Sequence, residues 1–212
     1  ACEVDVGSGV LCMNPAHMIY QVMTDIEDGM GYPSAIIDDA SFRAAADLFK
    51  AEGIGLFIKW MQSDKIEAFI QQVADHCNAM VGQNPNTTLF EIIPMRGGYD
   101  VEDLVVLTPS NSTLELFERT TLEETVNEIT VKWDDTYTRN DGSVTLQNLA
   151  NINAMGGVIN QTKTYPGCPT MSIAKRLAQR DLDIASSQLA RMRVRVNRTV
   201  GMEILPGHVV RV

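Results

Sequence analysis

The sequence contains no closely spaced pair of cysteines and no long uninterrupted run of apolar residues. Its four cysteines, Cys2, Cys12, Cys77 and Cys168, lie far apart without a CxxC pair, which argues against a zinc ribbon and a dithiol redox motif. We expect reduced, partly buried thiols. No apolar run approaches the roughly 18 residues that a transmembrane helix needs, and the start "ACEVDVGSGV" lacks the basic and apolar regions of a signal peptide. The sequence therefore predicts a soluble protein without a membrane anchor.

Positive charge is scarce everywhere except in the last segment of this chain, whose net charge is -10. Residues 1–100 carry 5 basic and 14 acidic side chains, residues 101–167 carry 4 and 10, and residues 168–212 carry 8 and 3. The basic segment has no Phe, Tyr or Trp, whereas nucleic-acid-binding surfaces usually combine positive charge with aromatic side chains. We therefore expect no sequence-specific binding of nucleic acid. The basic segment is instead complementary in charge to the acidic remainder, in the same molecule or in a neighbouring copy.

The three histidines have no partners at the spacings that metal sites require. His17 and His208 belong to no HExxH or HxH motif, so we interpret them as ordinary helix or turn residues. Asp75, His76 and Cys77 bring a carboxylate, an imidazole and a thiol together in the sequence. Adjacent residues of a helix point about 100° apart, however, and do not form the hydrogen bond that a nucleophile and its base require. We interpret Cys77 as a core residue and Asp75 and His76 as surface residues.

Phosphate-binding and calcium-binding motifs are absent as well. The "GSG" at Gly7 lacks the Lys-Ser/Thr of a P-loop, and the "RGG" at Arg96 is an isolated turn. The acidic stretches "DIEDG" and "IIDDA" lack the alternating oxygen ligands and the distal Glu of an EF-hand. A pair of carboxylates that converges in space, as in glycoside hydrolases, stays open because nothing in the sequence selects a pair. We predict no catalytic residue, no cofactor and no metal site.

The first half of the chain begins with an amphipathic helix. Asn14 is a good N-cap, Pro15 suits the first helical position, and Gly29 predicts the end of the helix. The apolar stripe of this helix comprises Met18, Ile19, Val22, Met23 and Ile26.

Two further helices and one strand follow. The second helix is predicted from about Ser41 to Glu52, and the third begins at a Ser63 cap and carries an apolar face that extends from Ile66 through Cys77 to Met80. The segment between them alternates in a way that is typical of a half-buried strand. Its apolar positions are Ile54, Leu56, Ile58 and Trp60.

The second half is richer in β-branched and aromatic residues that are separated by Gly, Pro, Asn and Asp. Four short strands are predicted within residues 87–95, 101–109, 113–120 and 127–133. A tight hairpin turn is predicted at Asn140, Asp141 and Gly142. The last long helix is predicted from about Ser172 to Gln188, with Ile184 and Leu189 on or near its apolar face.

The pattern predicts an α+β protein with two domains. The 45% of hydrophobic residues suffices for a substantial core. We expect a boundary near Pro109 to Asn111, with an α+β subdomain of three helices and a small sheet in residues 1–110. Residues 111–212 are expected to form a β-rich domain with one helix near 172–188.

Arginine and apolar residues alternate near the end of the chain. Successive side chains of a strand point to opposite faces, so this stretch has a basic face and an apolar face. The two faces are Arg191, Arg193, Arg195 and Met192, Val194, Val196. We interpret the arginines as the polar face of a sheet rather than as a grip for nucleic acid.

Two long segments together resemble the phage tail tip attachment (J-like) and baseplate central hub proteins. The first comprises "NPAHMIYQVMTD" and "IDDASFRAAADLFKAEGIGLFIKWMQSDKIEAFIQQVADHCNAM". The second comprises "NEITVKWDDTYTRNDGSVTLQN", "GGVINQTKTYPGCPTMSIAKRLAQRDL" and "GMEILPGHVVRV", and it is similar to the second tube-like domain of that family. The resemblance is one of pattern and covers nearly the whole chain. No single short motif is diagnostic.

The resemblance implies a structural protein without catalytic residues: a homotrimeric hub that links the tail tube to the fibre or spike that meets the host. It further implies that residues 111–212 form a small barrel or sandwich, with the apolar face of the arginine strand packed beneath the last helix. Arg191, Arg193 and Arg195 would then face the lumen or a neighbouring subunit. Because hub domains lie inside longer chains, we expect an internal segment of a longer protein.

The implied partners are other copies of the chain, the tail tube, distal tail proteins and the tape measure protein, with the host receptor contacted only through regions outside this chain. The protein would be made in the bacterial cytoplasm and would be located at the virion tail tip. Two alternatives stay open. One is the hub of a related contractile secretion or gene transfer apparatus, and the other is a tail-associated cell-wall hydrolase.

Overall fold

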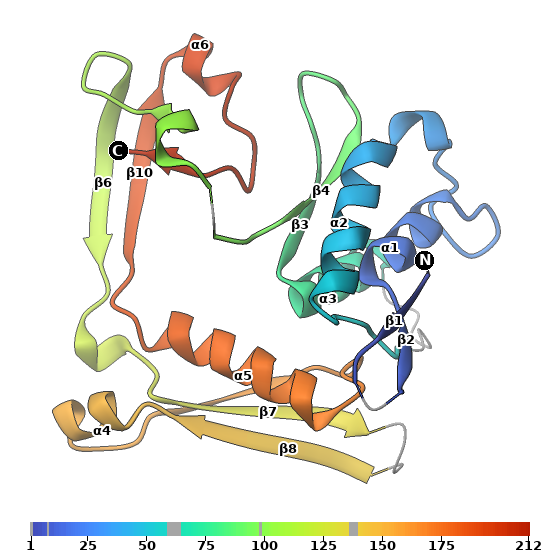
Figure 1. Ribbon diagram of the computed structural model, residues 1–212. Helices are drawn as coiled ribbons and strands as arrows, with labels where there is room; N and C mark the ends of the chain where they lie inside the picture. Colours follow the sequence, from blue (N-terminus) through green and yellow to red (C-terminus); the bar gives the residue numbers. More distant parts are fainter. Residues whose placement is uncertain (1, 8, 59–64, 98, 136–139) are drawn as a thin grey trace.

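The computed structural model describes residues 2–7, 9–58, 65–97, 99–135 and 140–212. The chain contains both helices and strands, and Figure 1 shows them in three groups. Three helices and a hairpin lie on one side, a helix covers a sheet along the base, and a long two-stranded ribbon rises on the other side. The predicted α+β class is confirmed.

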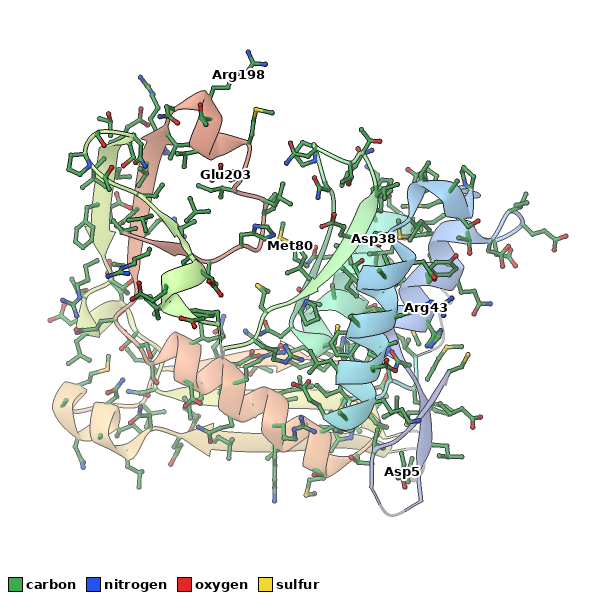
Figure 2. All side chains as sticks on the ribbon, turned by 45° about the horizontal axis from the view of Figure 1, so that its top comes forward. Asp5, Asp38, Arg43, Met80, Arg198 and Glu203 are labelled. Carbon is green, nitrogen blue, oxygen red and sulfur yellow. The ribbon has the colours of Figure 1, made fainter. Side chains whose placement is uncertain are left out.

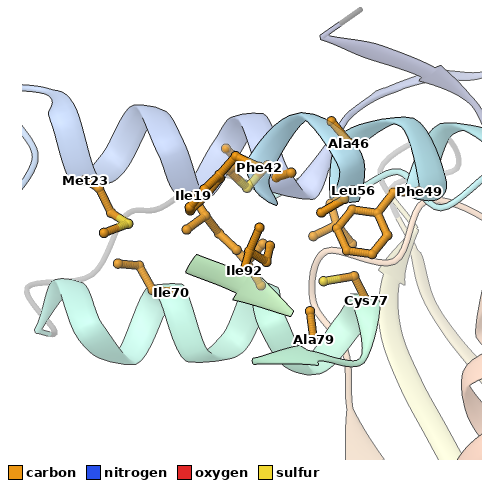
Figure 3. Close-up of a cluster of buried hydrophobic side chains, with 14 of the residues drawn as sticks. Ile19, Met23, Phe42, Ala46, Phe49, Leu56, Ile70, Cys77, Ala79 and Ile92 are labelled. Carbon is orange, nitrogen blue, oxygen red and sulfur yellow. The ribbon is translucent and has the colours of Figure 1, made fainter. Parts of the chain in front are cut away.

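The first group of elements encloses a hydrophobic cluster. Its helices are α1 (Pro15–Thr24), α2 (Asp39–Ala51) and α3 (Ile66–Cys77), and its hairpin consists of the antiparallel strands β3 (Ala79–Gln83) and β4 (Phe90–Pro94). Figure 3 shows how side chains from all these elements meet. The labelled members are Ile19, Met23, Phe42, Ala46, Phe49, Leu56, Ile70, Cys77, Ala79 and Ile92. Burial of each large apolar side chain stabilises the fold by about 1.5–3 kcal/mol.

The start of α1 lies where the sequence predicted it. The Asn14 side chain accepts a hydrogen bond from the backbone N–H of Ala16 and donates one to the carbonyl oxygen of Ala46 at 2.8 Å. Asn14 is fully buried. This residue therefore caps one helix and ties it to the next.

The end of α1 lies earlier than predicted. The helix stops at Thr24 rather than at Gly29, because the Asp25 carboxylate accepts hydrogen bonds from the backbone N–H groups of Glu27 and Asp28. Such local bonds compete with helical ones. Ile26, predicted in the apolar stripe, is 85% exposed.

The strand predicted between α2 and α3 is wrong for the part that the structure describes. Leu56 forms only an isolated antiparallel bridge with Met13, and the segment otherwise runs without a ladder. Trp60 and the predicted Ser63 cap lie outside the described residues. The N-cap of α3 is Lys65, and Met80 lies in β3 rather than in the helix.

The base of the molecule is a sheet with the strand order β8-β7-β9. Strand β7 (Glu128–Asp135) pairs antiparallel with β8 (Asn140–Gln147) and parallel with β9 (Asn160–Thr164), and the short helix α4 (Leu149–Met155) precedes β9. Helix α5 (Met171–Ala185) packs on β7 and β8 and ends three residues earlier than predicted. The buried members of this cluster include Ile129, Val131, Trp133, Tyr165, Cys168, Ile173, Leu177 and Leu182.

A second short hairpin joins this cluster from the start of the chain. Strands β1 (Glu3–Asp5) and β2 (Leu11–Met13) pair antiparallel, and Val4 and Cys12 are buried with the side chains of α5 and β7. The proposed division at residue 110 stays a prediction.

The predicted turn at Asn140–Gly142 lies within strand β8 instead. Gly142 is opposite Trp133 in the register, and a Cβ at this position would lie 2.4 Å from an indole carbon of that residue. Glycine here makes room for the indole. The hairpin itself is present, but residues 136–139 lie outside the described residues.

The two long strands β6 (Ser112–Arg119) and β10 (Ala190–Val196) form an antiparallel ribbon. Beside it, β5 (Val105–Val106) pairs parallel with β11 (Val210–Arg211), and helix α6 (Arg198–Gly201) follows β10. Three 3-10 turns complete the described elements: Ser34–Ile36, Val101–Asp103 and Leu122–Glu124.

A small barrel or a sandwich was expected in residues 111–212. The strands that the structure describes do not close a barrel, so the first of these two forms is wrong for a single chain. The reason is that α5 occupies one face of the three-stranded sheet while β6 and β10 pair only with each other. None of the helices in the described ranges combines the length and apolar character of a transmembrane span.

Candidate functional site

The candidate site is an exposed surface on the β6–β10 ribbon, which forms the side of the molecule opposite α1 and α2 (Figures 1 and 2). The strands pair from Ala190 opposite Arg119 to Val196 opposite Ser112, and the register shifts between Arg193 and Val194. At that shift Glu115 is the extra residue of β6, so β6 carries a β-bulge.

The bulge determines which side chains share a face. Met192 is opposite Phe117 and Val194 is opposite Leu114, so residues 114 and 117 of β6 lie on one face although they are three positions apart. A regular strand would place them on opposite faces. The ribbon therefore has one continuous apolar face.

This apolar face is largely uncovered. Leu114 is 57% exposed, Phe117 56% and Met192 43%, while Val194 is half-buried. Contiguous exposed apolar side chains of this kind are typical of an interaction surface. Packing of this face beneath α5, as predicted for Met192, Val194 and Val196, is wrong, because the buried side chains of α5 lie in a cluster with those of β7.

The other face of the ribbon is basic. Arg191, Arg193 and Arg195 all lie exposed on β10, opposite Glu118, Leu116 and Thr113 in the register. Arg195 forms an ion pair with Glu115 at the bulge. The structure thus brings the three predicted arginines together on one exposed face, and their role as a subunit or lumen contact stays a prediction.

Sequence reasoning missed the apolar face because half of it comes from β6. Leu114 and Phe117 appear on opposite faces in a strict alternation, and only the bulge at Glu115 unites them. The signal available in the sequence was the mixture of apolar and charged residues in 113–119, which does not alternate strictly.

The Asp75-His76-Cys77 sequence forms no catalytic pair. Cys77 Sγ donates to the carbonyl oxygen of Ala74, and burial raises the pKa of its thiol to about 12. This thiol is therefore protonated at neutral pH, unlike a catalytic nucleophile. The interpretation of Cys77 as core and of Asp75 as surface is confirmed, but His76 is buried rather than exposed.

Two arginines meet the end of helix α3. Arg180 of α5 donates to the carbonyl oxygens of Asp75 and His76, and Arg96 donates to those of Cys77 and Asn78. The last carbonyl groups of a helix lack partners within it and carry partial negative charge. The two guanidinium groups therefore cap α3 and connect it to the rest of the molecule.

These same arginines line a cleft of about 250 Å³ between α3 and α5. Arg96 also forms two hydrogen bonds of 2.8 Å with the Glu52 carboxylate, which lower the pKa of that carboxyl. Arg180 donates to the hydroxyl of Tyr165 and the carboxylate of Asp181. Because the guanidinium groups of both arginines bind acceptors of the protein itself, we interpret the cleft as a structural contact between α3 and α5 rather than as an anion site.

Metal-binding chemistry has no support in the described part of the chain, where no group of three or more His, Cys, Asp or Glu residues could hold an ion. His17 lies in α1 beside Asp47 and Arg43, and His208 lies after the turn that precedes β11.

A match to a protein family points to phage tails. A family described as "Putative phage tail protein" matches residues 65–212, which is more than half of the chain. No curated protein matches. Among solved structures, the chain is similar to the 43 kDa tail protein of prophage MuSo2 from Shewanella oneidensis, with 12% identity and a TM-score of 0.39. That match covers 64% of this chain and 40% of the prophage protein. The chain therefore belongs to this family of phage tail proteins.

Proposed function

We propose that this chain is part of a homotrimeric hub at the tail tip of a phage or prophage, where it links the tail tube to the fibre or spike that attaches to the host. The observation that carries the proposal is the β6–β10 ribbon. It presents an apolar face and a basic face to solvent in a chain of a phage tail family.

A hub needs surfaces that hold subunits together rather than a reaction centre. Cyclic assemblies use head-to-tail contacts, in which one patch meets a different patch of the next copy. Residues 168–212 carry 8 basic and 3 acidic side chains, while residues 1–167 are net acidic. This separation of charge supports association between unlike surfaces.

The partners in this proposal are other copies of the chain, the tail tube, the distal tail proteins and the tape measure protein. The host receptor is reached only through regions outside the chain. The protein is made in the bacterial cytoplasm and takes its place in the virion tail tip.

Electron microscopy of the parent particle labelled with an antibody to this chain tests the location. We expect label at the distal end of the tail. Label along the tube, at the head or nowhere on the particle would contradict a tail-tip hub.

Sedimentation of the full-length parent protein tests the symmetry. We expect a trimer. A stable, salt-insensitive two-fold dimer is incompatible with a ring at the tail end and would overturn the hub proposal.

The hydrolase alternative requires convergent acids or a Cys–His pair in an open site. Asp181 is the only buried carboxylate among the described residues, and Tyr165, Arg180 and Lys163 all bind it. No observation favours this alternative, and cleavage of peptidoglycan by the purified chain would establish it. The hub of a contractile secretion or gene transfer apparatus differs in the particle that carries it, so the same labelling experiment distinguishes it.

A further inference from the structure

We infer that the β6–β10 ribbon pairs, head to tail, with the ribbon of another copy of this chain, so that the outer edge of β10 in one copy lies along the outer edge of β6 in the next. The inference rests on the proposed hub in one respect, that the neighbour is a second copy. It goes beyond the proposed hub by naming the strands in contact and their order.

The first argument is that the ribbon is incomplete. Strands β6 and β10 pair with each other, and in the part of the chain that the structure describes no third strand joins either outer edge. A two-stranded ribbon is marginally stable in water by itself, and its open edges present unpaired N–H and C=O groups to another strand. The unpaired backbone groups of each edge can therefore form hydrogen bonds with a further strand.

The second argument is that the apolar face is also incomplete. Leu114, Phe117 and Met192 expose between 43% and 57% of their surface. A sheet that continues into another copy places further apolar side chains beside them, on the same face and at the spacing of neighbouring strands.

The third argument selects the strand that meets β10. Pairing of β10 with β10 of another copy would place arginine side chains opposite one another along one face. Like charges directly opposite destabilise a sheet. Strand β6 instead offers the charges that already match β10 within the chain, since Arg191 is opposite Glu118 and Arg195 forms an ion pair with Glu115.

The fourth argument concerns closure. A two-fold contact through β6 alone would leave the edge of β10 open, with its backbone N–H and C=O groups unpaired. A head-to-tail contact uses both edges of every copy, and a ring built in this way leaves no edge. The ribbon therefore favours a ring over a two-fold dimer.

Hydrogen exchange of the 212-residue chain, measured over a range of concentrations, tests which strands are in contact. We expect residues 112–119 and 190–196 to become protected together as the concentration rises. Protection of only one of the two strands would indicate a two-fold contact and overturn the inference. Association without protection of either strand, or a chain that stays monomeric at every concentration, would overturn it as well.

Charge reversal tests the pairing of β10 with β6. We expect Arg191→Glu to raise the concentration of half-association about tenfold, because it replaces a positive charge of β10 by a negative one beside the acidic side chains of β6 in the neighbour. The double variant Arg191→Glu/Glu118→Arg restores the opposite charges and should restore association. Failure of the double variant to restore it, with normal folding by circular dichroism, would contradict the pairing.

Two further variants separate this effect from total charge and from misfolding. Lys175→Glu makes the same change of net charge on the exposed side of α5, and we expect association as in the unaltered chain. Arg193→Glu lies opposite Leu116 and so leaves no like-charge pair within the chain, and it should still weaken association. Equal effects of Lys175→Glu and Arg193→Glu would reduce the result to net charge and overturn the inference.

Failure of the ribbon pairing and failure of the proposed hub function give different experimental results. Tail-tip label on the particle together with a monomeric chain would leave the hub proposal standing and remove this inference. Ribbon-mediated association without tail-tip label would do the reverse.

Discussion

The backbone N–H of Gly167 donates a hydrogen bond to Nε2 of His76 at 3.2 Å, and so joins the loop after β9 to the end of helix α3. Nδ1 of His76 lies 2.6 Å from the carbonyl oxygen of Gln72. A carbonyl only accepts, so Nδ1 carries the proton and Nε2 must be unprotonated. The neutral imidazole is therefore the form that fits this joint.

This relationship predicts loss of stability in mild acid. Burial lowers the pKa of His76, with the charges of Arg180 and Asp75 acting in opposite directions. The unfolded chain, with a histidine pKa of about 6.5, then binds the proton at a higher pH than the folded chain does. The contribution of His76 is fully present above pH ~6.5 and decreases as the pH falls towards its lowered folded pKa. Urea denaturation between pH 7.5 and 5 measures this decrease.

The matched pair for that measurement is His76→Gln and His208→Gln. Glutamine does not titrate, so we expect the first variant to lose the part of the pH dependence that lies just below pH ~6.5. The second variant alters an exposed histidine and should keep it. A pH profile unchanged by His76→Gln would show that another group causes the decrease.

The close approach of Trp133 to Gly142 predicts a large effect of one methyl group. Gly142→Ala places a Cβ 2.4 Å from the indole, so the ring or the strand must move. We expect a loss of about 1–3 kcal/mol in the free energy of unfolding. Gly82→Ala in β3 is the control, since no atom lies within 4 Å of its added Cβ. Equal effects of the two substitutions would show that the indole does not require the glycine.

The buried cap of α1 predicts a cost greater than that of an ordinary cap. Asn14→Ala removes the acceptor for Ala16 and also leaves the carbonyl oxygen of Ala46 without its donor. The lost cap costs about 1 kcal/mol and the unsatisfied buried carbonyl about 1–3 kcal/mol more. Asn148→Ala at the half-buried cap of α4 should cost only the first amount. Denaturant midpoints of the two variants make the comparison, and a smaller loss at Asn14 would refute it.

The different burial of Val131 and Val194 predicts that an introduced charge destabilises the fold more at the first position than at the second. Val131 is fully buried beneath α5, so Val131→Asp should abolish stable folding or cost more than about 4 kcal/mol. Val194 is half-buried on the ribbon, and Val194→Asp should cost much less. Arg193→Glu should leave folding nearly intact. Thermal melting of the three variants gives the order, and equal losses at Val131 and Val194 would place the ribbon in the core.

The elements that sequence reasoning predicted well are those whose signals are local. The Asn14 cap, the apolar faces of α2 and α5 and the arginine alternation of β10 depend on residues within a few positions of each other. The resemblance to phage tail proteins rested on patterns spread along nearly the whole chain, and the family model of phage tail proteins matches residues 65–212. Ends of elements were less predictable. A single carboxylate at Asp25 stops α1, and the pairing of Gly142 with Trp133 places that glycine inside a strand.

The sequence by itself determined the α+β class, the division of charge between the last segment and the remainder, and the exposure of Arg191, Arg193 and Arg195. Only the tertiary structure decided what lies against what. Strand β10 pairs with β6 rather than packing beneath α5, and the bulge at Glu115 gathers Leu114 and Phe117 on one face. The buried His76 likewise has a distant partner, because the N–H group that binds its Nε2 belongs to Gly167, 91 positions away. Local patterns indicate which face of a strand is apolar, but the surface that covers such a face comes from distant parts of the chain.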